Sequence, residues 1–177
     1  LDPNTKTVLV TGGSQGAGSI NRALAGAAER ITGAGFQVLH AYGRKNDAPA
    51  TMDGYTAVPY IDDMEAAYAV ADLVVCRSGA MTVAENSAAG LPAIYVPLPH
   101  GNGEQGLNSA HLVATGAAVR IDDASLTPDV LAEEVLGILG SPDRYQEMRS
   151  ALETSGAGNV AEELARRITK AAARLSL

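Results

Sequence analysis

The alternation of short β-branched runs with helix-length, alanine-rich stretches constrains the fold of this chain most. Six apolar runs cover residues 7–10, 36–41, 55–59, 72–76, 93–96 and 117–121. Strands that read as continuous apolar runs are covered on both faces of a sheet, and intervening helices give right-handed crossovers between parallel strands. The sequence therefore predicts one α/β domain, a doubly wound parallel sheet of about six strands.

The sequence signals for helices fall between and after these strands. Helices are expected over residues 19–31, 62–71, 82–89, 104–115 and 159–175, and two more are expected to start at Pro128 and Pro142. Thr127 and Ser141 precede these prolines as expected N-caps, and Pro is favoured at the first helical position. Asp62 and Glu65 have the spacing of a capping box.

Ligands bind such a sheet beyond the carboxyl ends of its strands, where the strand order reverses. The strand-to-helix segments 12–18, 60–64, 77–82 and 97–105 carry unusual residues. These four segments are therefore where we expect a site.

Composition excludes several classes of protein. The 177 residues are 46% hydrophobic, and 13 Lys and Arg against 20 Asp and Glu give a net charge of −7. This balance argues against a nucleic-acid partner, and no apolar run reaches the roughly 18–20 residues of a membrane span. The single cysteine, Cys76, fits a reducing, cytoplasmic compartment. The chain starts at Leu1 without a signal peptide or initiator Met, so we expect a piece of a longer protein.

The glycine-rich segment 12–18 follows a strand and opens a helix. Glycines let the backbone approach a ligand closely, and helix-terminal N–H groups favour an anion. The segment lacks the G-x-G-x-x-G spacing, and Ser19 stands where a P-loop requires Lys. A dinucleotide-binding oxidoreductase and an ATPase are therefore disfavoured, and a tight turn without a ligand stays an alternative.

A second candidate site covers residues 77–85. Gly79 allows a sharp turn after the strand, and the small residues that follow leave several amides free at a helix start, which suits a diphosphate. Glu85 lies one turn further, where its carboxylate can accept hydrogen bonds from two ribose hydroxyls. Thr82 and Glu85 also satisfy the capping-box rule, so the spacing leaves both interpretations of Glu85 open.

A third candidate site opens the helix that starts at Glu104. Glu104, Gln105 and Asn108 share the face of its first turn. Amides and carboxylates there can bind the hydroxyls of a sugar, and a solvated first turn is the alternative. The acidic pairs at 62–63 and 122–123 lack the D-x-D spacing that holds a metal-bound diphosphate, and the sequence predicts no metal site and no cofactor.

These segments resemble the carboxyl-terminal half of the MurG family of bacterial glycosyltransferases. The resemblance runs from Lys6 to the end of the chain and is carried by residues 12–16, 60–64, 76–85, 90–92, 104–105 and 108. It implies that residues 1–177 are the Rossmann-like donor-binding half of a GT-B enzyme. The implied reaction is inverting transfer of N-acetylglucosamine from UDP-N-acetylglucosamine to lipid-linked N-acetylmuramoyl-pentapeptide in peptidoglycan synthesis.

The resemblance also implies roles for ten residues. The Ile61 backbone would bind the uracil edge, and Glu85 would bind the ribose. The expected diphosphate contacts are Ser14 and the amides of Ala80, Met81, Thr82 and Val83, and the expected sugar contacts are Glu104, Gln105 and Asn108. Glu104 stands where the family often has a glutamine, and a carboxylate accepts hydrogen bonds without donating them.

In the family an acceptor domain precedes this half and carries the lipid-acceptor site and the membrane contact. We therefore expect the chain alone to bind the donor without catalysing transfer, with the base in the missing domain and helix 159–175 packed towards it. The whole protein would be peripheral on the cytoplasmic face of the bacterial plasma membrane. Two alternatives are a donor subunit of a split lipid-linked-sugar transferase and a non-catalytic nucleotide-sugar binding module.

Overall fold

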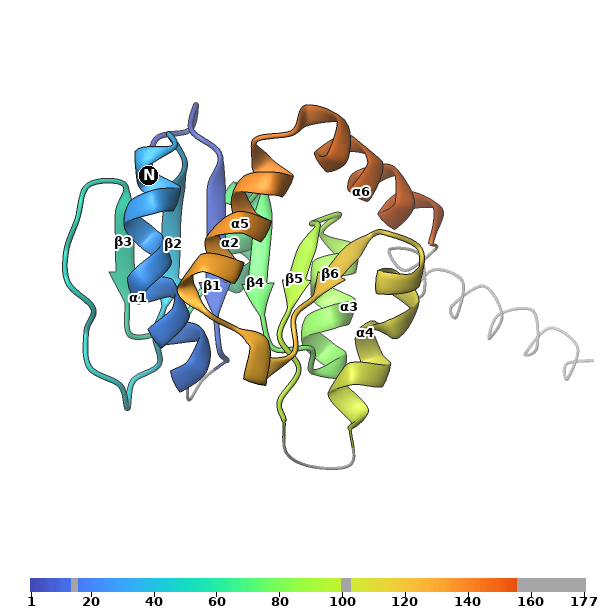
Figure 1. Cartoon of the computed structure of the whole chain (residues 1–177), viewed down its shortest axis with the longest axis horizontal. Coiled ribbons are helices and arrows are strands. Elements are labelled where there is room, and N and C mark those ends of the chain that lie inside the picture. Colours follow the sequence, from blue (N-terminus) through green and yellow to red (C-terminus); the bar gives the residue numbers. More distant parts are fainter. Residues whose placement is uncertain (14–15, 100–102, 156–177) are drawn as a thin grey trace, which may run out of the picture.

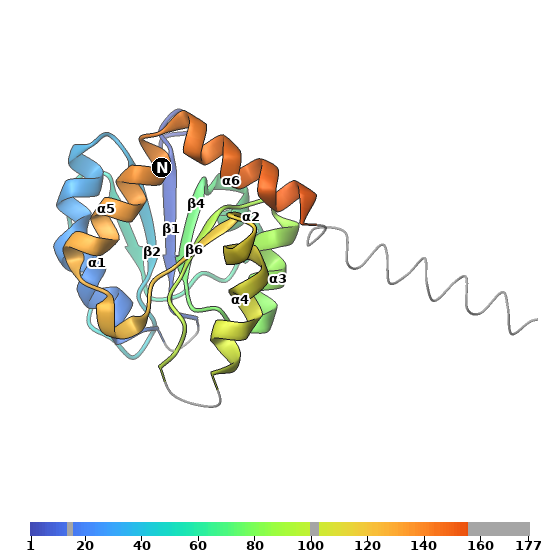
Figure 2. The ribbon, with the colours of Figure 1, turned by 45° about the vertical axis from the view of Figure 1, so that its right-hand side comes forward.

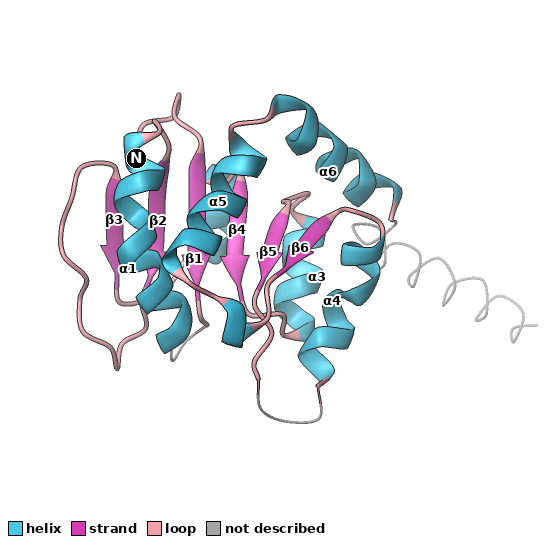
Figure 3. Cartoon of the chain, viewed as in Figure 1, coloured by secondary structure: helices cyan, strands magenta, loops and turns pink. Residues whose placement is uncertain are grey.

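The computed structural model describes residues 1–13, 16–99 and 103–155. It contains a six-stranded sheet in the order β3-β2-β1-β4-β5-β6, in which every neighbouring pair is parallel (Figures 1 and 3). The strands are β1 (Thr7–Thr11), β2 (Gln37–Ala41), β3 (Tyr55–Val58), β4 (Leu73–Cys76), β5 (Ala93–Tyr95) and β6 (Ala118–Arg120). The predicted doubly wound α/β sheet is confirmed. Helix 159–175 of the sequence prediction lies outside the described residues.

Helices cover both faces of the sheet. They are α1 (Gly18–Gly33), α2 (Met64–Val70), α3 (Ala80–Ala88), α4 (Glu104–Ala114), the 3-10 turn η1 (Asp123–Ser125), α5 (Pro128–Leu139) and α6 (Pro142–Thr154). Helices α1 and α5 pack on one face, and α2, α3 and α4 lie on the other (Figures 1 and 2). Helix α6 crosses the edge where the strands begin, and Tyr145 on it donates a hydrogen bond to the carbonyl of Asp72 at the start of β4.

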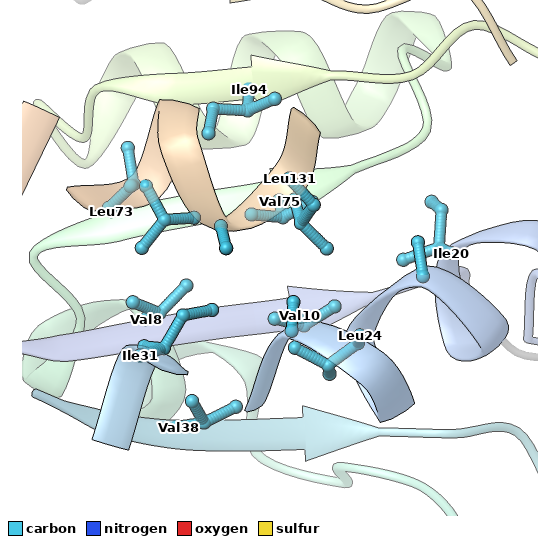
Figure 4. Packing of buried hydrophobic residues seen from close by; sticks show 14 of the residues in the cluster. Val8, Val10, Ile20, Leu24, Ile31, Val38, Leu73, Val75, Ile94 and Leu131 are labelled. Carbon is cyan, nitrogen blue, oxygen red and sulfur yellow. The ribbon is translucent and has the colours of Figure 1, made fainter. Parts of the chain in front are cut away.

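The central strand β1 divides the core into two clusters because successive side chains of a strand point to opposite faces. Val8 and Val10 pack with α1 and α5 (Figure 4), whereas Leu9 packs with the residues of α2, α3 and α4. Helix α1 meets the sheet through a stripe that includes Ile20 and Leu24, both fully buried. Each such side chain stabilises the fold by about 1.5–3 kcal/mol through burial.

The predicted capping box at the start of α2 is wrong. Helix α2 begins at Met64 with Asp63 as its N-cap, and the Asp63 side chain accepts from the Ala66 amide at 2.9 Å, so the box of Asp62 and Glu65 does not form. An N-cap has non-helical backbone angles, and Asp63, one residue later than predicted, has φ −106° and ψ 85°.

Helix α3 also starts earlier than the predicted residue 82. Gly79 is extended, with φ −61° and ψ 146°, and leads the chain from β4 directly into the helix at Ala80. Thr82 is therefore inside the first turn and cannot be an N-cap. By contrast, the predicted N-caps Thr127 and Ser141 are confirmed, since their side chains accept hydrogen bonds from backbone amides three residues on.

A buried polar chain ties the start of α1 to the sheet. His40 on β2 is 1% exposed; its Nδ1 lies 2.6 Å from the Tyr55 hydroxyl, and its Nε2 lies 3.0 Å from Asn21 Oδ1. Because Asn21 Nδ2 donates to the Tyr42 carbonyl, its Oδ1 accepts, which assigns the imidazole proton to Nε2 and leaves Nδ1 to accept from Tyr55. Burial lowers the pKa of His40 from 6.5 to about 4.

We predict that His40 makes the free energy of unfolding depend on pH. The unfolded chain binds a proton at His40 below pH 6.5 and the folded chain does not, so stability falls as the pH drops from about 6.5 towards 4. Over that range the loss is about 3 kcal/mol, at 1.36 kcal/mol per pKa unit. Urea unfolding at pH 7 and pH 4.5 measures it in the wild type and in His40→Gln.

The exposed His111 on α4 provides the control, since His111→Gln should keep the wild-type pH dependence. If His40→Gln lost as much stability as the wild type between the two pH values, the buried neutral imidazole would not be the cause.

Candidate functional site

A pocket of about 600 Å³ opens at the carboxyl ends of the strands, where the order reverses between β1 and β4. Its wall is formed by the loop after β1, the loop between β3 and α2, the end of β4 with the start of α3, and the segment that follows β5 (Figure 3). All four segments singled out in the sequence contribute residues to this wall. The pocket therefore lies at the edge of the sheet where the topology predicts a site.

Glycine is required in the loop after β1. A Cβ on Gly12 would come within 2.1 Å of the Ala17 amide nitrogen. A Cβ on Gly16, which has φ +74°, would come within 2.3 Å of the Tyr42 carbonyl oxygen. The loop thus folds back tightly enough to bring the first residues of α1 to the pocket wall. Ser14 lies outside the described residues, so its expected diphosphate contact stays a prediction.

The start of α3 adjoins the pocket through Gly79 and Thr82. Ala80, Met81 and Thr82 occupy the first three helical positions, whose N–H groups have no partner inside a helix. The Val83 amide donates to the Gly79 carbonyl at 2.9 Å, as the first bond of the helix. The predicted availability of the Val83 amide is therefore wrong, because the helix starts two residues earlier than the sequence indicated and uses that amide in its first bond.

Glu85 reaches a neighbouring helix instead of its own backbone. It lines the pocket, and its Oε2 accepts a hydrogen bond from the Tyr68 hydroxyl on α2 at 2.9 Å. Burial and this hydrogen bond raise the pKa of Tyr68, so the phenol stays protonated and donates a hydrogen bond to the carboxylate. The capping interpretation of Glu85 is wrong. Tyr68 engages one of the two carboxylate oxygens, Oε2.

The three residues expected to bind a sugar do different things. Gln105 lines the pocket, and its Oε1 accepts from the Leu98 amide at 3.0 Å, which leaves the amide group Nε2 as its donor. Asn108 Nδ2 donates to the carbonyl of Ser78 at 3.0 Å. Neither Asn108 nor the exposed Glu104 is among the described residues that line the pocket.

Three of the remaining expected contacts, Ala80, Met81 and Val83, are not among the described residues that line the pocket. Ile61 lines the pocket between Tyr60 and α2. Ala80 and Met81 are exposed beside Thr82, and Thr82 itself lines the wall. The structure thus brings Ile61, Thr82, Glu85 and Gln105 to one cavity.

A polar network at the pocket wall was not anticipated from sequence. Arg77 Nη1 donates to Asp123 Oδ1 at 2.5 Å and to the carbonyls of Val96 and Pro97 at 3.1 and 3.2 Å. Arg77 Nη2 donates to Ser19 Oγ at 2.9 Å, and Ser19 Oγ donates to Asp123 Oδ1 at 2.6 Å. The network joins α1, the end of β4, the segment after β5 and η1.

The charge of Arg77 is neutralised inside this network. Burial raises the pKa of Asp123, but the hydrogen bonds from Ser19 and Arg77 outweigh that effect and hold the pKa below its usual value. The carboxylate therefore stays ionised opposite the guanidinium. In the sequence, Arg77 stands out only as a charged residue at the end of an apolar strand. No local pattern relates it to Asp123, which lies 46 positions later.

Comparison with known proteins places the chain in a family. Residues 7–164 match the glycosyltransferase family 28 C-terminal domain. The chain belongs to this family. The match includes every described segment that lines the pocket, and it confirms the resemblance carried by the sequence motifs.

Two relatives of this family 28 chain carry the same name. A Corynebacterium efficiens protein is 57% identical over 172 residues, which cover 97% of this chain and 48% of that protein. A Rhodococcus jostii protein is 51% identical over 177 residues, covering 98% of this chain and 46% of that protein. Both are named UDP-N-acetylglucosamine–N-acetylmuramyl-(pentapeptide) pyrophosphoryl-undecaprenol N-acetylglucosamine transferase.

A solved structure supports the same family. The crystal structure of Acinetobacter baumannii MurG superposes with a TM-score of 0.73 at 30% identity, over 94% of this chain and 51% of that one. The family 28 chain therefore spans about half the length of the relatives that it matches.

Two features are absent from the described residues. No helix within residues 1–13, 16–99 and 103–155 has the length and apolar character needed to cross a bilayer. In the same residues, no three His, Cys, Asp or Glu side chains are grouped as ligands of a metal ion.

We predict that Asp123→Ala lowers the free energy of unfolding by about 3 kcal/mol, because it leaves the guanidinium of Arg77 buried without its partner. The two side chains are only 16% and 18% exposed. The neighbouring pair of Arg120 and Asp122 is 44% and 64% exposed, so Asp122→Ala should cost less than about 1 kcal/mol. Urea unfolding of both variants tests the contrast, and equal losses would contradict it.

Proposed function

We propose that this chain is the donor-binding half of an inverting N-acetylglucosaminyltransferase that uses UDP-N-acetylglucosamine. One observation carries the proposal: Gly79 and Thr82 at the start of α3 line the same pocket as Glu85, at the switch point of the sheet. The names of relatives that align with nearly the whole chain support the donor and the reaction.

The donor diphosphate would bind at the start of α3. The N–H groups of Ala80, Met81 and Thr82 supply donors there, and the helix dipole adds a partial positive charge of about half an elementary charge. Glu85, one turn further, would accept from the two ribose hydroxyls. The backbone of Ile61 would contact the uracil edge, and Ser14 the diphosphate region.

The transferred sugar would lie against Gln105. Its Nε2 is available as a donor to a sugar oxygen because Oε1 is held by the Leu98 amide. Glu104 and Asn108 are not assigned to the sugar in this proposal, since Asn108 is committed to Ser78.

Inverting transfer needs the acceptor hydroxyl in line with the anomeric carbon, a base for its proton, and stabilisation of the departing UDP. This chain would supply the last of these, since the amides of α3, fixed by the helix backbone, would face the charge that develops on the leaving diphosphate. The base and the lipid-linked N-acetylmuramoyl-pentapeptide site would belong to the other half, as would contact with the cytoplasmic face of the plasma membrane.

Calorimetric titration with UDP, UDP-N-acetylglucosamine and UDP-N-acetylgalactosamine tests the proposal. We expect UDP to bind and UDP-N-acetylglucosamine to bind more tightly, because Gln105 adds a contact to the sugar. The C4 epimer reports how strongly the pocket selects between the two sugars. A chain that bound none of the three would overturn the proposal.

We predict that Glu85→Ala weakens UDP binding by about 1.5–3 kcal/mol, the usual range for hydrogen bonds to a charged group, or about 10- to 150-fold. The effect should be smaller for 2′-deoxy-UDP, which lacks one of the two hydroxyls. Glu133→Ala on α5 removes an equal charge from an exposed site on the opposite face of the sheet and should leave affinity unchanged. Unchanged affinity in Glu85→Ala would remove Glu85 from the ribose site.

A further inference from the structure

Ser78 joins the starts of two helices. It is fully buried and lies immediately before Gly79, the N-cap of α3. Its Oγ donates to the backbone carbonyl of Gln105 in the first turn of α4 at 2.7 Å. Its own carbonyl accepts from Asn108 Nδ2, one turn further along α4, at 3.0 Å. We call Ser78, Gln105 and Asn108 the Ser78 clamp.

The clamp fixes Gln105 relative to the start of α3. The backbone of Gln105 is held by Ser78, and its side chain is held by the Leu98 amide. Ser78 is two residues from Ala80, the first residue of the helix whose amides face the proposed diphosphate. The distance between those amides and Gln105 Nε2 therefore depends on the two hydrogen bonds of Ser78.

We propose that Ser78 is a positioning residue that sets the sugar contact of Gln105 at the correct distance from the diphosphate site, with Asn108 as the second half of the clamp. The inference rests on the proposed function. The sugar and the diphosphate of the donor are covalently joined, so both contacts contribute fully only when the protein holds them at the matching spacing. Without the clamp, the diphosphate contacts remain, and the affinity that the sugar adds to UDP binding falls.

Ser87 provides a matched control on the same helix. It is also buried, at 4% exposure, and its Oγ donates to the Val83 carbonyl at 2.7 Å. That bond has the same chemistry and length as the bond of Ser78 Oγ, but it lies within α3 and joins no second element. Loss of either hydroxyl removes one buried hydrogen bond, but only Ser78→Ala removes a hydrogen bond to α4.

The test compares the affinities of UDP and UDP-N-acetylglucosamine in the wild type, Ser78→Ala and Ser87→Ala by calorimetry. The measured quantity is the ratio of the two dissociation constants, which is the gain in affinity that the sugar provides. We expect Ser78→Ala to reduce this gain at least about threefold, within the range of coupling between contacting residues, and Ser87→Ala to keep it. Asn108→Ala should reduce it in the same way, which keeps the proposal testable if Ser78→Ala does not fold.

A double-mutant cycle separates positioning from general damage. If Ser78 acts through Gln105, then Ser78→Ala does not further reduce the gain in affinity from the sugar in a chain that already carries Gln105→Ala. An unchanged gain in Ser78→Ala, or an equal loss in both backgrounds, would overturn the clamp while leaving UDP binding and the proposed function intact. A wild-type chain that bound no UDP would overturn the proposed function and the clamp together.

Discussion

The reversal of strand order between β1 and β4 is the constraint on which the rest of the structure depends. The chain leaves β1 towards α1 on one face of the sheet and leaves β4 towards α3 on the other face. Because the two loops diverge, a pocket opens between them at the carboxyl edge. The proposed diphosphate amides, Glu85 and the glycine loop all adjoin that opening, so the site follows from the connectivity of the sheet.

The sequence was sufficient to predict the fold and the place of the site, but not several partners within it. Continuous apolar runs such as 72–76 identify buried parallel strands without knowledge of their neighbours. The start of α3 was misplaced because Thr82 has the residue type and spacing of an N-cap, whereas the real N-cap, Gly79, supplies only an extended backbone. The residue type at position 82 favoured a later helix start, but the extended backbone of Gly79 after β4 lets the helix begin at Ala80.

Asn108 shows a second reason why sequence falls short. Helical periodicity correctly places Asn108 on the face of Gln105, three residues away. Periodicity does not reveal which element lies opposite that face, and the carbonyl of Ser78, thirty residues earlier, takes the amide. The same holds for Arg77 and Asp123, which meet only after β4 and η1 are brought to one edge. Such pairs depend on the tertiary arrangement.

The electrostatics of the pocket follow from these pairings. The chain carries a net charge of −7, and the guanidinium of Arg77 at the pocket wall is bound to Asp123. In the proposed function, attraction for a diphosphate would therefore come from short-range dipoles, namely the amides at the start of α3 and the helix dipole behind them. Neutral donors fixed by the backbone need no reorganisation when charge develops on a leaving group. The paired arginine thus joins four elements of the pocket wall, and in the proposed function the backbone of α3 would bind the anion.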